Sequence, residues 1–171
     1  CASAISIHIP GDGVPIIIVR RQLIAVPSPE TAQRYFWPEF SVLGNCVFVR
    51  SCAPTGRLDT KLFATRTDIE VAYNHLHIWD LLSWLYPARR SFKTQATLVG
   101  HAIAANWATK LAFEFPRKKF LVFYTNEHDP IVRFHTLRPR EPAWLDIASA
   151  PKDWNTFAYK VINGAIQKIS V

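Results

Sequence analysis

The densest group of ionisable side chains in the sequence is Glu127-His128-Asp129, in a five-residue segment that ends at Pro130. A histidine flanked by carboxylates has the parts of a general base, because nearby negative charge raises the pKa of an imidazole. The same residue types are also common in exposed turns. We prefer the turn interpretation, and keep His128, Asp129 and the following His135 as candidate catalytic residues.

Histidine pairs elsewhere do not form a metal-binding pattern. His75 and His77 fall in a segment predicted to be helical, where a step of two residues is a rotation of about 200°, so one ion could not contact both rings. His77 and Asp80 would lie one turn apart and could share a ligand. A metal site would need long-range assembly from His77, His128 and His135, and no cysteine pair has zinc-finger spacing. The sequence therefore predicts no metal site and no cofactor.

Cys1 offers a different chemistry. A first-position cysteine can act as a nucleophile with its own α-amine as the base. Removal of an initiator methionine, an upstream cleavage or lipid attachment would also account for Cys1, and the sequence leaves these alternatives open. Cys46 and Cys52 fall in one predicted strand about 20 Å apart, and a disulfide spans at most about 7 Å between Cα atoms. Free thiols, with no visible signal or transmembrane segment, predict a cytoplasmic location.

The formal net charge of +7 would attract anions such as nucleic acid, an acidic protein or an anionic membrane surface. Basic residues alternate with aromatics at Arg34-Tyr35-Phe36-Trp37 and Arg133-Phe134-His135. Aromatic side chains beside cations suit sequence-tolerant binding of single strands. The same aromatics are also the usual core residues of a domain, and no known RNA- or DNA-binding motif is present.

The elements that would position these groups are organised around residues 94–138. Residues 98–115 predict a helix that is apolar on most of its circumference and hence buried on most sides, and Pro116 ends it. Residues 120–125 and 131–138 predict an antiparallel hairpin around the turn at 126–130. In the second strand Val132 and Phe134 would face the core, while Arg133 and His135 would form a wet, basic face.

The remaining segments predict an α+β fold in one domain, residues 1–171, with a mainly antiparallel sheet, a long central helix and two or three further helices. The expected elements are strands at 4–9, 14–19 and 42–53, a short helix from Pro29, a helix from the Thr67–Glu70 capping box to about residue 86, and a final helix at 154–169.

These observations favour a non-enzymatic binding domain whose basic face meets an acidic protein or nucleic acid. The predicted binding residues are Lys118, Lys119, Arg133, His135 and Arg138. The alternative is a small hydrolase that uses Cys1 or a His/Asp site near the 126–135 hairpin. The sequence does not define the oligomeric state.

Overall fold

The computed structural model describes residues 6–8, 16–19, 22–25, 29–56, 58, 61–82, 92–126 and 128–170. They form an α+β fold with antiparallel sheets, as the sequence predicts. In chain order the elements are β1 (Ser6–His8), β2 (Ile16–Val19), β3 (Gln22–Ala25), α1 (Pro29–Phe36), β4 (Phe40–Leu43), β5 (Cys46–Val49), the 3-10 turn η1 (Arg50–Cys52), α2 (Arg66–Tyr73), β6 (His75–His77), α3 (Ile78–Leu82), α4 (Phe92–Glu114), β7 (Phe120–Asn126), β8 (Pro130–Thr136), the 3-10 turns η3 (Ile147–Ser149) and η4 (Lys152–Trp154), β9 (Phe157–Ile162) and β10 (Ala165–Ser170).

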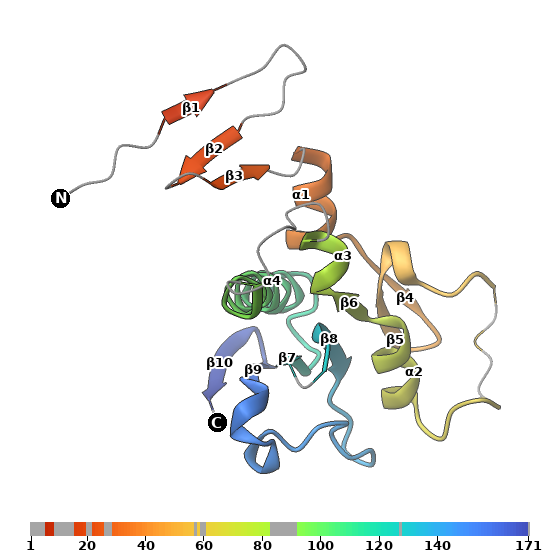
Figure 1. Ribbon diagram of the computed structural model, residues 1–171. Helices are drawn as coiled ribbons and strands as arrows, with labels where there is room; N and C mark the ends of the chain where they lie inside the picture. The colour runs from red at the N-terminus through yellow and green to blue at the C-terminus, as the bar shows by residue number, and fades with distance from the viewer. Residues whose placement is uncertain are drawn as a thin grey trace.

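The main layer is a five-stranded antiparallel sheet in the order β10-β9-β7-β8-β6, with α4 packed across one face. Figure 1 shows α4 nearly end-on beside these strands. Alternate residues of β7, among them Val122 and Tyr124, point into the core beneath the helix. Gly100 of α4 lies directly over Tyr124, so that an added Cβ would come within 2.4 Å of the tyrosine ring. The helix approaches the sheet closely because this position has no side chain.

The exposed side of α4 carries large apolar residues. Leu98 is 67% exposed and Phe113 is 83% exposed. Lys110 on α4 is instead buried, and its ammonium lies 3.3 Å from Glu114 and 5.4 Å from the centre of the Trp37 ring. The predicted helix and its end before Pro116 are confirmed.

The hairpin of β7 and β8 is confirmed, but its expected wet, basic face is wrong. The face that carries His135 is covered by the segment after β8, which packs Leu145 and Ile147 onto Phe123 and its neighbours. Both sides of the hairpin are therefore buried, and Arg133 is only partly exposed within it.

The predicted helix from Thr67 to residue 86 is wrong. The capping box lies two residues earlier, between Thr65 and Asp68, and α2 ends at Tyr73. Asn74 leaves the helical conformation (φ −89°, ψ 59°). Its side chain accepts a hydrogen bond from the Val49 N–H and donates one to the Val47 carbonyl in the neighbouring strand β5. The chain can then extend and pair with β8 as β6 before α3 begins.

The predicted final helix is also wrong, because residues 157–170 form the β9–β10 hairpin. Asn163 and Gly164 both have positive φ, at 50° and 75°, which is the conformation of a two-residue hairpin turn. Phe157 and Val161 are four residues apart, as on one face of a helix. With Tyr159 between them they also form a series spaced by two residues, as on one face of a strand. These three side chains point into the core that α4 covers.

The N-terminal half follows its predictions more closely. The described strands β1 and β2 fall within the two predicted runs, and β3 adds a third strand to their sheet. The predicted strand at 42–53 is instead the β4–β5 hairpin, turned by Gly44 and Asn45 at φ 57° and 68°. Cys46 in β5 and Cys52 in η1 are both free. No helix in the described residues is long and apolar enough to cross a membrane.

Candidate functional site

The edge strand β6 carries two histidines on one face. His75 lies opposite Arg133 of β8, and His77 lies opposite Ile131. Alternate residues of a strand point to the same side, and the two rings lie edge to face with centres 5.1 Å apart. The predicted separation of His75 and His77 around a helix is therefore wrong. Likewise His77 and Asp80 lie in different elements, β6 and α3, not one turn apart on one helix.

Each of the two imidazoles is held through its Nδ1 atom. Nδ1 of His77 contacts Oδ2 of Asp129, and Nδ1 of His75 lies 2.7 Å from the carbonyl oxygen of Ala72. A carboxylate or carbonyl can only accept, so in both rings Nδ1 carries the proton, and in a neutral ring the lone pair is on Nε2. The sheet thus orients two neighbouring imidazoles with the same tautomer.

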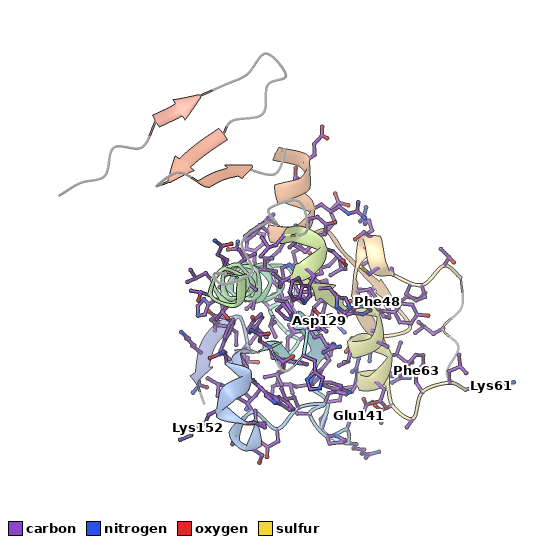
Figure 2. All side chains as sticks on the ribbon, viewed as in Figure 1. Phe48, Lys61, Phe63, Asp129, Glu141 and Lys152 are labelled. Atoms are coloured by element: carbon purple, nitrogen blue, oxygen red, sulfur yellow. The ribbon has the colours of Figure 1, made fainter. Side chains whose placement is uncertain are left out.

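Asp129 is placed by the turn before β8. Its Oδ2 atom binds His77, while its Oδ1 atom is buried and has no hydrogen-bond partner among the described residues. In Figure 2 Asp129 is labelled close to β6 and the start of α3. The Asp129 carboxylate can therefore accept one further hydrogen bond.

Arg133 places a cation on the same face as the imidazoles. Its guanidinium carbon lies 5.2 Å from the centre of the Trp144 ring, and that indole stacks on Phe123 at 5.7 Å. Burial lowers the pKa of Arg133, while the charge of Asp129 raises it. Arginine remains charged at neutral pH even so, and its stacking fixes the charge in one place.

His135, a predicted catalytic and binding residue, has no exposed surface. Its Nδ1 donates to the carbonyl of Thr136 at 3.1 Å, and its Nε2 accepts from the backbone N–H of Trp144 at 3.4 Å. Burial lowers the pKa of His135, outweighing the hydrogen bond to Thr136. A neutral ring saturated in this way anchors the loop that carries Trp144.

Arg138 is drawn into the protein by Glu70, a fully buried carboxylate. Its Nη1 donates to Glu70 at 2.9 Å, and the same carboxylate accepts from the backbone of Val47 and from the backbone and hydroxyl of Thr136. Burial, followed by the charge of Glu70, raises the pKa of the nearby Cys46 thiol. This network joins α2 to β5 and β8.

Lys118 and Lys119 lie at the other end of β8 from Asp129. The ammonium of Lys118 donates to the Asn45 side chain at 2.9 Å, and Arg138 donates to the Asn45 carbonyl at 3.3 Å. Leu137 donates to the carbonyl of Lys119 at 2.7 Å. Three of the predicted binding residues, Lys118, Lys119 and Arg138, therefore lie at this end of β8, at a distance from Arg133.

The remaining predicted site residues are divided between the surface and the undescribed part of the chain. His128 is exposed and directly precedes Asp129 in the turn before β8. Cys1 and Glu127 lie outside the described residues.

Sequence reasoning missed His75 and His77 as a pair. The signal was present in His-Leu-His, whose alternation suits a half-buried strand, directly after an asparagine that can end a helix.

Comparisons with protein-family models, curated proteins and solved structures gave no match. Within the described ranges, no group of three or more His, Cys, Asp or Glu side chains could hold a metal ion. The arrangement of His75, His77, Asp129 and Arg133 instead has the parts for moving protons beside a fixed positive charge.

Proposed function

We propose that the protein is an enzyme of the acid–base type, with His75 and His77 as its proton-transferring groups. The observation that carries this proposal is the matched orientation of the two rings. Each is held at Nδ1, which places the lone pair of a neutral ring on Nε2, where it can meet a reacting molecule. His75 is exposed and the side chain of His77 is 36% exposed, so a substrate can reach both.

The two rings differ in their partners, and this assigns their roles. His77 contacts a carboxylate, Asp129, through Nδ1, and we assign it the role of general acid. His75 is held by the carbonyl oxygen of Ala72, and we assign it the role of general base, which accepts a proton at Nε2. Arg133 stabilises negative charge on the substrate. Such a set suits transfer or hydrolysis of an ester of an anionic acid.

The proposal is tested with p-nitrophenyl acetate, p-nitrophenyl phosphate and bis(p-nitrophenyl) phosphate. We expect hydrolysis of at least one ester, with kcat/KM about 100-fold lower in His75→Ala and His77→Ala, a size usual for loss of an acid or base. Asp129→Asn removes the charge that positions His77, so it should lower kcat and leave KM unchanged.

The matched control is His101→Asn. His101 lies on α4, across the sheet from the imidazole pair, with its ring nitrogens within 3.2 Å of the Tyr159 hydroxyl. This variant should hydrolyse the esters at the wild-type rate. Equal rates in all variants would contradict the proposal, as would a wild-type protein inert both toward all three esters and toward a phosphodiester that carries its own nucleophilic hydroxyl group.

A second candidate function is binding of an acidic protein or nucleic acid through the basic end of the molecule. The contacts of Lys118 and Arg138 with Asn45, and the position of Lys119 next to Lys118 at the same end of β8, favour it. Lys118→Glu with Lys119→Glu should then weaken binding to heparin or single-stranded nucleic acid and reduce its salt dependence. Lys152→Glu with Lys168→Glu, at exposed positions on η4 and β10, is the charge-matched control. Unchanged binding in the double variant would remove this candidate.

A further inference from the structure

We infer that the substrate of the imidazole pair is single-stranded RNA, cleaved by attack of its own 2′-hydroxyl group. The inference rests on the proposed acid–base function and names its substrate class. It follows from three features of the site: the source of the nucleophile, the number of proton-transferring groups, and the charge around them.

The hydrogen bonds of the two imidazoles in the described structure go to a carbonyl and a carboxylate, not to a hydroxyl or thiol that could act as a nucleophile. In enzymes that form a covalent intermediate, a histidine is hydrogen-bonded to the serine, threonine or cysteine that it activates. Here Nδ1 of His75 is occupied by a carbonyl and Nδ1 of His77 by a carboxylate. The Nε2 atoms can meet a hydroxyl group, and in this inference the substrate supplies it.

Two imidazoles match a reaction that needs one proton removed and one delivered. With ring centres 5.1 Å apart, the pair can serve two oxygens of one phosphodiester. His75 takes the proton of the ribose 2′-hydroxyl as the 2′-oxygen forms a bond to phosphorus. The bond from phosphorus to the 5′-oxygen breaks, and His77 gives its proton to that leaving oxygen. The products are a 2′,3′-cyclic phosphate and a free 5′-hydroxyl, with His75 left protonated and His77 left neutral, so that bonds, protons and atoms balance.

The charge around the pair suits a phosphodiester. Arg133 lies opposite His75 in the register of β6 and β8, and its guanidinium is fixed by Trp144. A fixed guanidinium can bind the non-bridging phosphate oxygens, whose negative charge grows as the fifth bond to phosphorus forms. The chain's net charge of +7 would raise the local concentration of a polyanion.

A single strand fits better than a duplex. The imidazoles lie on a short edge strand, and a single strand can bend so that the 2′-oxygen, the phosphorus and the leaving oxygen become aligned. An RNA duplex holds its backbone in the regular A-form and is contacted mainly by its shape. We therefore expect unpaired linkages to be cleaved.

The test uses the full chain and a DNA oligonucleotide that contains one ribonucleotide, with the all-DNA strand of the same sequence beside it. The assay contains EDTA, and products are identified by mass spectrometry. We expect a cut only on the 3′ side of the ribonucleotide, with a 2′,3′-cyclic phosphate end. The rate should fall at least about 100-fold in H75Q and in H77Q, fall about 10-fold in R133Q, and be unchanged in H101N.

Each other outcome has a defined meaning. Cutting of the all-DNA strand at the same rate would overturn the inference, since the 2′-hydroxyl would not be the nucleophile. Equal cutting by every variant would overturn it too, because a contaminating nuclease would then be responsible. If the ribonucleotide strand stays intact while a p-nitrophenyl ester is hydrolysed in a His77-dependent way, the RNA inference is wrong and the acid–base function stands. If both substrates stay intact, both proposals are wrong.

Discussion

Two carboxylates lie toward opposite ends of β8, each beside a cationic or protonatable partner, and their surroundings differ. Glu70 is fully buried, pairs with Arg138 and accepts hydrogen bonds from the backbone of Val47 and from the backbone and hydroxyl of Thr136. Asp129 is partly exposed, pairs with His77 and keeps one oxygen without a partner in the described residues. Figure 2 labels Asp129 near β6 and Glu141, a neighbour of Arg138, below α2.

The difference shows which polar groups stabilise the fold and which remain able to react. The distinction depends on their burial and on their hydrogen bonds. A buried, saturated carboxylate holds three elements together, and losing it leaves several donors without partners. A partly exposed pair with unused hydrogen-bonding capacity contributes little to stability. Its groups can still bind a ligand and exchange protons. The two ends of β8 should therefore respond in opposite ways to mutation.

The largest effect on stability is expected for Glu70→Ala. This change strands the N–H groups of Val47 and Thr136 and the guanidinium of Arg138, at a cost of about 3–5 kcal/mol in the free energy of unfolding. Urea denaturation measures this loss. The control is Glu39→Ala, which breaks an exposed ion pair with Arg50 and should cost less than about 1 kcal/mol. Equal losses of unfolding free energy in the two variants would show that the hydrogen bonds of Glu70 do not stabilise the fold.

The next largest loss is expected for Asn74→Ala. Its side chain accepts from the Val49 N–H at 2.9 Å and donates to the Val47 carbonyl at 2.7 Å, both in buried positions. Loss of the two bonds should cost about 2 kcal/mol, again by urea denaturation. The control is Asn106→Ala, at a partly exposed position of α4. A cost as small as that of the control would contradict this view of Asn74.

A smaller effect, tied to pH, is expected from His135. Burial lowers its pKa in the folded protein, while the unfolded chain has a value of about 6.5. The unfolded state therefore binds the proton first, and stability falls as the pH drops below about 6.5 toward the folded-state pKa. His135→Gln should flatten this part of the curve of unfolding free energy against pH.

His101, whose pKa is lowered by burial and by the charge of Lys168, titrates in the same direction. The His101→Asn variant therefore separates its share from that of His135. A curve that keeps its full slope between pH 6.5 and 5 in His135→Gln would show that another group is responsible.

The smallest change in stability is expected for His77→Ala and Asp129→Asn. About a third of each side chain is exposed, so that water screens the pair, and each variant should lose less than about 1 kcal/mol by urea denaturation. The same variants carry the large activity losses expected above. A loss of stability as large as that of Glu70→Ala would show that the His77–Asp129 pair is a structural contact. The proposed difference between the Glu70 and Asp129 ends of β8 would then be wrong.

Much of the central architecture followed from the sequence because its signals were long and consistent. Residues 98–115 are apolar over most of their length and stop at a proline, and the two runs of strand formers that follow flank a clear turn. The errors lie where a short pattern fits two periods. Phe157 and Val161 suit a helix at a spacing of four and a strand at a spacing of two, and the Asn163-Gly164 turn decides for the strand.

The candidate site was predictable only in part. Asp129 and Arg133 were identified because their segment was assigned correctly. His75 and His77 were separated by a false helix, since the end of α2 depends on contacts that Asn74 makes with β5, which is distant in the sequence. The burial of His135 also depends on a later segment, the loop of Trp144, whose position no local pattern gives.

The attachment of the β4–β5 hairpin has a consequence for how the protein opens. The outer edge of β5 meets no strand in the described structure; side chains of α2 occupy the positions where backbone groups of a neighbouring strand would bind. Rocking of α2 away from β5 would release the amides of Val47 and Val49 together while the amides of β7 stay paired on both sides. In deuterated solvent those two amides should therefore exchange as a unit, and faster than their depth in the protein suggests.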